Sequence, residues 1–147
     1  MSPAPSAPSA APAPAAPSAA PSPAPGPGVQ PGARPAPRLS AATAALVNQA
    51  HAQAAHGDAD LALTTLDRAL RIEPENPLLW IELAQVHEGA AHYALADSVA
   101  HKALQLAAGD PVLQARAWHL IADSLRARDL NADAQAADAR AQTLAPR

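Results

Sequence analysis

The sequence predicts an all-α fold in which three antiparallel helix hairpins stack into a short solenoid behind a disordered tail. Two observations carry this prediction. Thirteen of the seventeen prolines lie within residues 1–38, and a helical pattern of apolar residues repeats along the rest of the chain. We therefore divide the chain into a tail, residues 1–39, and one folded domain, residues 40–147.

The tail consists almost wholly of proline, alanine, serine and glycine, with Arg34 and Arg38 as its charged side chains. Because proline fixes φ and removes a backbone donor, this stretch cannot propagate a helix or a sheet. It is predicted to sample extended polyproline II segments and to act as a spacer. Pro-x-x-Pro spacings also suggest a ligand for a proline-binding domain, but the basic and bulky residues that strengthen such ligands are missing.

The folded part matches itself at an offset of 34 residues. The matched pairs are Leu46 with Trp80, Ala62 with Ala96, Ala69 with Ala103, Leu70 with Leu104 and Ile72 with Leu106. The same landmarks recur at an offset of 38, as in Trp80 with Trp118, Leu83 with Ile121, Ala96 with Ala134, Ala103 with Ala141 and Leu106 with Leu144. A period of this size indicates a solenoid of repeats at about 43–76, 77–110 and 115–147, with four extra residues around 107–113.

Each repeat divides into two helical patterns. In the second repeat, Leu79, Leu83 and Val86 recur at helical spacing, a Gly/Ala/His stretch interrupts, and the helical period resumes from Leu95 to Leu106. This order predicts a helix, a turn and a helix.

Start and stop signals fit the same division. Asn76 and Asp110 each supply an N-cap residue followed by proline at the first helical position, and Asn131 is expected to cap the last helix. Gly57 falls at the first hairpin turn, where a residue that accepts positive φ is useful.

These residues resemble the tetratricopeptide repeat, whose signature is Trp-x2-Leu-Gly-x2-Tyr on the first helix, alanines on the second and a closing proline. The second repeat shows Trp80, Leu83, Ala84 and His87, then Tyr93, Ala96, Ala100 and Ala103, and the third shows Trp118, Ile121, Ala122 and Leu125, then Ala134, Ala141 and Pro146. The first repeat shows Leu46, Gly57, Ala62, Leu66, Ala69 and Pro74. The resemblance covers about residues 41–147 and implies a right-handed array. Alanine replaces the usual glycine, and histidine or leucine the usual tyrosine, in the second and third repeats.

The resemblance also implies a concave groove, lined by the first helix of each pair, that holds a peptide or helix of a partner protein. The candidate groove residues are Asn48, His51, Glu82, Gln85, Glu88, Arg116, His119, Asp123 and Arg126, beside the apolar Val47 and Ile81. Some members of the family clamp a chaperone's C-terminal carboxylate with lysine, asparagine and arginine, and at the matching positions here only Arg116 fits. For each groove residue the alternative is an ordinary solvated helix face.

No catalytic, cofactor or metal site is predicted. The serines and threonines lack a paired histidine and carboxylate, and a solenoid offers a groove rather than a closed pocket. His51 with His56, and His87 with His92, lie five residues apart, which is not the i, i+4 spacing of a helical metal pair. Trp80, Trp118 and Tyr93 fall at packing positions of the repeat, so a packing role is expected in preference to ligand stacking.

Charge and composition bear on partners and location. From Leu39 onward, eight Lys/Arg stand against thirteen Asp/Glu, and this acidic balance argues against nucleic acid as a partner. The chain has no cysteine, no apolar run long enough to span a bilayer and no signal sequence at its start, so the chain as written is expected to be cytoplasmic. Ala/Pro-rich tethers ahead of such repeats resemble those of bacterial envelope proteins, which would place the protein in the periplasm or anchor it to the envelope if a signal sequence lies upstream.

The predicted function is a non-catalytic protein–protein interaction scaffold, with an accessory role in bacterial envelope assembly. The alternative is a self-associating structural module, a homodimer formed through the terminal repeats. In that alternative, the last helix packs on a second copy instead of capping the stack.

Overall fold

The computed structural model describes residues 1, 3–5 and 35–145. The chain divides into two units, Met1–Ala33 and Arg34–Arg147. In the first unit, the described residues form neither helix nor strand. The predicted spacer role of the rest of the tail lies outside the described residues.

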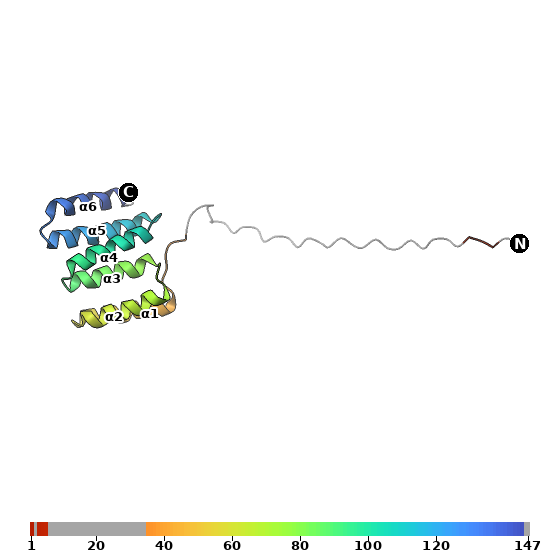
Figure 1. Cartoon of the computed structure of the whole chain (residues 1–147), viewed down its shortest axis with the longest axis horizontal. Helices are drawn as coiled ribbons and strands as arrows, with labels where there is room; N and C mark the ends of the chain where they lie inside the picture. The colour runs from red at the N-terminus through yellow and green to blue at the C-terminus, as the bar shows by residue number, and fades with distance from the viewer. Residues whose placement is uncertain (2, 6–34, 146–147) are drawn as a thin grey trace. The chain divides into compact units, whose positions relative to one another are not determined.

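Residues 35–145 form six helices and no strand, which confirms the all-α prediction (Figure 1). The helices are α1 (Ala41–Ala55), α2 (Ala59–Ile72), α3 (Pro77–Gly89), α4 (Tyr93–Leu106), α5 (Pro111–Ala127) and α6 (Asn131–Leu144). They pair as the hairpins α1–α2, α3–α4 and α5–α6, and each hairpin packs on the next. The three hairpin turns lie at one end of the array and the two linkers, residues 73–76 and 107–110, at the other (Figure 1).

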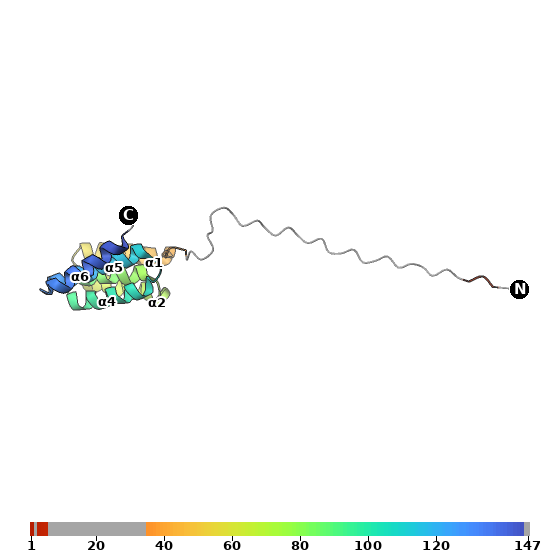
Figure 2. The ribbon, with the colours of Figure 1, turned by 90° about the horizontal axis from the view of Figure 1, so that it is seen from above.

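The first helices of the hairpins form one side of the array and the second helices the other. Helix α3 contacts both α1 and α5, so the three first helices are neighbours. In the view from above, α1 and α5 lie along one edge while α2 and α4 lie along the opposite edge (Figure 2). A side chain on α3 can therefore reach partners on both neighbouring hairpins.

The three hairpin turns share one backbone design. Gly57, Ala91 and Asp129 occupy equivalent positions and have φ of 88°, 60° and 62°. In each turn the next N–H donates to the carbonyl five residues back: Asp58 to Gln53 at 2.9 Å, His92 to His87 at 2.8 Å and Leu130 to Leu125 at 3.0 Å. This is the Schellman motif, which ends a helix with one left-handed residue. The first repeat meets that requirement with glycine, whereas the other two hold a strained residue there.

Helix starts agree with the sequence in two places and differ in one. The side chains of Asn76 and Asp110 accept hydrogen bonds from the first turns of α3 and α5, as predicted. The prediction for Asn131 is wrong, because the preceding turn makes Leu130 the residue before α6 and Asn131 the first helical residue. The four extra residues of the third repeat form an additional turn at the start of α5, which has 17 residues against 13 in α3.

A hydrogen-bonded cluster, which we call the Glu73 clasp, joins the start of α1 to the end of α2. It consists of Ser40, Thr43, Glu73 and Asn76. Glu73 Oε1 accepts from the Ser40 N–H at 3.0 Å and from Thr43 Oγ1 at 2.8 Å, and Glu73 Oε2 accepts from Asn76 Nδ2 at 2.7 Å. The hydrogen bonds from Ser40, Asn76 and Thr43 lower the pKa of Glu73 to about 2, because they stabilise its ionised form.

The core is built largely from alanine, which lets the helices approach closely. Two buried clusters lie between successive hairpins: Val47, Ala50, Ala62, Leu66, Ala69, Leu79, Leu83 and Val86 form the first, and the second includes Ile81, Ala84, Ala100, Ala103, Leu113, Ala117, Leu120 and Ile121. Trp80 and Trp118 pack against these clusters, as predicted for packing aromatics. The Trp80 indole N–H donates to the Pro74 carbonyl at 2.8 Å, and the Arg140 guanidinium lies 4.7 Å from the ring centroid of Trp118.

Candidate functional site

Polar side chains from all three first helices meet on one surface, which we call the groove face. His51 on α1, Glu82 on α3 and Arg116 on α5 define it. His51 Nε2 lies 2.5 Å from Glu82 Oε2, and Arg116 Nη2 lies 3.9 Å from Glu82 Oε1. The Glu82 side chain is 14% exposed, so these two partners offset much of the cost of desolvating its carboxylate. The structure thus brings together three predicted groove residues that lie far apart in the sequence.

Three more predicted residues lie on the groove face near His51, Glu82 and Arg116. Asn48 and Gln85 are exposed, and their side chains make no hydrogen bond within residues 35–145. Glu88, one turn beyond Gln85 on α3, is partly buried. Burial raises the pKa of Glu88, and the negative charge of Asp123 raises it further. The groove face therefore combines free amide groups with closely spaced carboxylates.

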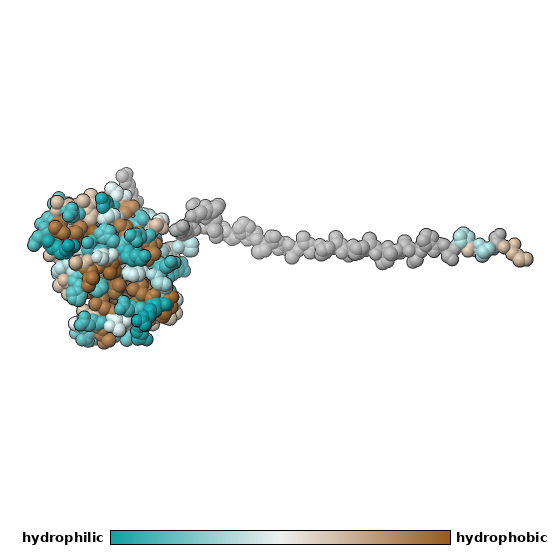
Figure 3. Space-filling model, viewed as in Figure 1, coloured by the Kyte–Doolittle hydropathy of each residue, from teal (hydrophilic) through white to brown (hydrophobic). Residues whose placement is uncertain are grey.

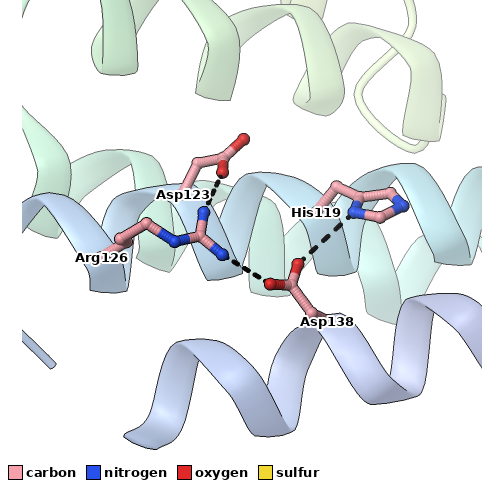
Figure 4. A network of polar contacts seen from close by, with 4 residues as sticks. All are labelled: His119, Asp123, Arg126 and Asp138. Atoms are coloured by element: carbon pink, nitrogen blue, oxygen red, sulfur yellow. Dashed lines mark hydrogen bonds and ion pairs between the residues drawn. The ribbon is translucent and has the colours of Figure 1, made fainter. Parts of the chain in front are cut away.

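The remaining predicted residues belong to a network between α5 and α6 (Figure 4). Arg126 donates to Asp123 at 2.6 Å and to Asp138 at 2.5 Å, and His119 Nδ1 lies 3.6 Å from the other oxygen of Asp138. Asp138 is on α6 and was not among the predicted site residues. Through Asp138, His119 and Arg126 are joined to α6 rather than to α3.

Repeat equivalence explains why this network is polar. At the offsets of 34 and 38, His119 corresponds to Val47 and Ile81, and Asp138 corresponds to Leu66 and Ala100. The four equivalent residues are at most 5% exposed, because each packs against the hairpin that follows. No helix follows α6 within the described chain, and there a histidine and an aspartate occupy these positions. The same offsets could have singled out Asp138 from the sequence.

An open hollow of about 920 Å³ lies at the turn end of the first two hairpins. Its lining consists of His51, Ala54, Gly57, Asp58, Ala59, Asp60, Leu61, Gln85, Val86, Gly89, Ala90 and His92. Two of the predicted groove residues, His51 and Gln85, are among them, so the hollow adjoins the groove face. Sequence reasoning missed it because its other walls come from the turns rather than from repeat signature positions.

The opposite side of the array has a different character. Helices α2 and α4 carry large apolar residues that are half-exposed, Ile72 on the former and Leu95 on the latter. Apolar side chains gather over the middle of this face, with hydrophilic residues around its margins (Figure 3). Half-exposed apolar residues thus mark this face, whereas the groove face is marked by the polar contacts among His51, Glu82 and Arg116.

Within the part of the chain that the structure describes, no three histidine, aspartate or glutamate side chains converge as ligands for a metal ion. None of the described helices combines the length and the apolar character needed to cross a membrane.

The stacked helix pairs define a helical repeat protein of the interaction type. A model of the tetratricopeptide repeat matches residues 43–86. The solved structure of the globular C-terminal domain of P. aeruginosa LpoP is 35% identical, with a TM-score of 0.69, and the match covers 71% of this chain and 99% of that chain. No curated protein matches the chain. The chain belongs to the tetratricopeptide repeat family, whose fold is a non-catalytic protein-interaction fold.

Proposed function

We propose that this protein is a non-catalytic scaffold that binds a peptide or helix of a partner protein on the groove face. The observation that carries the proposal is the chain of polar groups from His51 through Glu82 to Arg116, which crosses all three hairpins. A partner lying along these polar groups would contact every repeat at once. Solenoids use their extended surfaces for binding in this way.

The side-chain amides that lie beside His51, Glu82 and Arg116 suit peptide recognition. The amides of Asn48 and Gln85 can each donate to and accept from a peptide backbone, and both are exposed without a side-chain hydrogen bond in the described domain. Glu82 is positioned by its contact with His51 Nε2, at 2.5 Å, before a partner arrives. Such preorganisation reduces the entropy that is lost on binding.

The outer face of the third hairpin favours partner binding on the groove face over end-to-end assembly of copies of this protein. An interface between copies would desolvate His119, Arg126 and Asp138, which already pair with one another. Desolvating charged pairs is costly, and interface cores are depleted of charge.

An accessory role in the bacterial envelope is the finer part of the proposal. Its support is the likeness of this chain, over 71% of its length, to the globular C-terminal domain of P. aeruginosa LpoP, together with the Pro/Ala-rich stretch at residues 1–38. Fractionation of cells that express the natural gene is expected to recover the protein with the envelope or periplasm. Recovery in the cytoplasm alone would contradict this part.

Co-purification from the native host tests the groove. We expect a partner to co-purify with the wild-type chain and to be lost from the double variant Asn48→Arg/Gln85→Arg, which places two bulky positive charges at exposed positions of the groove face. Gln105→Arg is the matched control, because Gln105 is exposed on α4. Equal recovery with all three proteins would overturn the proposal.

A further inference from the structure

We propose that the hollow between the first two hairpins binds a lysine or arginine side chain, so that the partner segment on the groove face is basic. The inference rests on the proposed groove function and names the chemistry of the partner. It follows from the shape of the hollow, from the charges that line it and from its continuity with the groove face.

The hollow suits a long side chain with an apolar stem. Its volume of about 920 Å³ lies within the range of ligand pockets, roughly 300–1,000 Å³. Ala54 of α1, Leu61 of α2 and Val86 of α3 supply apolar lining, and Leu61 is 50% exposed. Lysine and arginine bury their methylene stems along such surfaces while the charged group stays in contact with polar atoms.

The charges of the lining all have one sign when histidine is neutral. Asp58 and Asp60 contribute carboxylates, and none of the lining residues is a lysine or an arginine. Asp58 precedes α2, yet its side chain does not cap the helix. Neither carboxylate has an ion pair within residues 35–145. A cationic side chain would therefore gain two acceptors that the domain itself does not use.

The groove face continues the same charge preference. Beyond the hollow lie Glu82, Glu88 and Asp123. Burial raises the pKa of Glu88, and the nearby negative charge of Asp123 raises it further. Arg116 and Arg126 are the cations on this side, and each already lies beside a carboxylate. A basic segment that enters the hollow and runs along α3 would meet negative charge at each step, whereas an acidic segment would meet repulsion.

A fragment titration tests the hollow without knowledge of the partner. The probe is Nα-acetyl-arginine amide, added to the ¹⁵N-labelled full chain, with Nα-acetyl-citrulline amide as its neutral counterpart of the same shape. We expect the arginine probe to shift the backbone amide signals of Gly57, Gly89 and Ala90, which line the hollow, and the citrulline probe to leave them nearly unchanged. Equal shifts with the two probes, or none with either, would overturn the inference.

Variants locate the charge that is responsible. We expect Asp58→Asn/Asp60→Asn to bind the arginine probe about fivefold more weakly, and Asp133→Asn, which alters an exposed aspartate in the first turn of α6, to bind it like the wild type. Unchanged affinity in the double variant would also overturn the inference. The two proposals fail separately: if the partner is lost from the groove variant but the probe does not bind, the inference alone is wrong. If the probe binds but the groove variant keeps its partner, the proposed function is wrong.

Discussion

Glu73 holds the start of the folded domain to the linker between its first two hairpins, and removing its carboxylate is predicted to destabilise the domain. Glu73→Ala deletes both acceptor oxygens, so three hydrogen bonds from Ser40, Thr43 and Asn76 are lost. Glu73→Gln keeps one acceptor oxygen but turns an amide N–H toward Asn76 Nδ2, another donor. Glu73→Ala therefore reports the loss of all three hydrogen bonds, whereas Glu73→Gln reports the loss of the negative charge and of the bond from Asn76.

The expected magnitude follows from the number and exposure of these bonds. A hydrogen bond to a charged group contributes about 1.5–3 kcal/mol when it is shielded from water. The clasp is only partly buried, so its donors recover part of this value from solvent. We expect Glu73→Ala to lower the free energy of unfolding by about 2 kcal/mol and Glu73→Gln by about 1 kcal/mol.

The effect depends on pH in a defined direction. The folded-state pKa of Glu73 is about 2, below the usual 4.5, so the unfolded chain binds the proton more readily. The stabilisation is therefore fully present above pH 4.5 and is lost progressively as the pH falls toward 2. The difference in unfolding free energy between wild type and Glu73→Gln should shrink over this window.

Urea denaturation followed by circular dichroism at 222 nm measures these differences at pH 7, 4 and 3. Glu75→Gln is the matched control, because Glu75 is exposed and takes part in no side-chain hydrogen bond or ion pair of the described domain. A difference between wild type and Glu73→Gln that stays constant from pH 7 to pH 3, or that equals the Glu75→Gln effect, would refute the reasoning.

Three further predictions concern the turns, the outer end and the groove. Ala91→Gly should raise the free energy of unfolding by about 0.5–1 kcal/mol, because Ala91 has a φ of 60°, which glycine adopts without strain. Gly57→Ala should lower it by a similar amount, because Gly57 has a φ of 88° and a Cβ there would meet no atom within 4 Å, so backbone strain is the only cost. The midpoints of urea denaturation check both changes. His119→Ile/Asp138→Ala replaces two paired polar residues with the apolar residues found at the equivalent positions of the second repeat, Ile81 and Ala100. This double variant should self-associate, so its mass in light scattering should rise with protein concentration. A constant monomer mass would contradict the idea that His119 and Asp138 keep the outer face of the third hairpin from packing on another copy. Burial and the charge of Asp123 raise the pKa of Glu88, which means that its ionised carboxylate destabilises the fold at pH 7. Glu88→Gln should therefore raise the free energy of unfolding by up to about 0.5 kcal/mol at pH 7 and have no such effect at pH 4, where the carboxyl is protonated. A lower free energy of unfolding at pH 7 would contradict this.

The helical layout could be predicted from the sequence because repeated patterns reinforce one another. Three agreeing copies of the apolar spacing predicted the hairpins, and Asn76 and Asp110, each followed by proline, predicted two helix starts. Asn131 misled, because a capping side chain is useful only where the preceding backbone is extended. At that turn the Schellman hydrogen bonds already fix the start of α6.

The candidate site could be predicted only in part. His51, Glu82 and Arg116 were found because they share one face of equivalent helices, and the structure brings them together. Asp138 is one of two aspartates on a helix of alanines and polar residues, and its pairing with His119 and Arg126 arises only where α6 packs beside α5. The hollow and the Glu73 clasp depend on how turns and linkers approach one another, which spacing along a helix does not encode.

Site-specific photocrosslinking in the native host tests most directly whether the groove face is the binding surface. A photoreactive residue would replace Asn48 or Gln85 on the groove face and, as a control, Gln105 on α4. We predict that both groove positions crosslink to the same protein partner and that the control does not. Adducts that form at Gln105 alone, or equally at all three positions, would contradict a groove-face binding site.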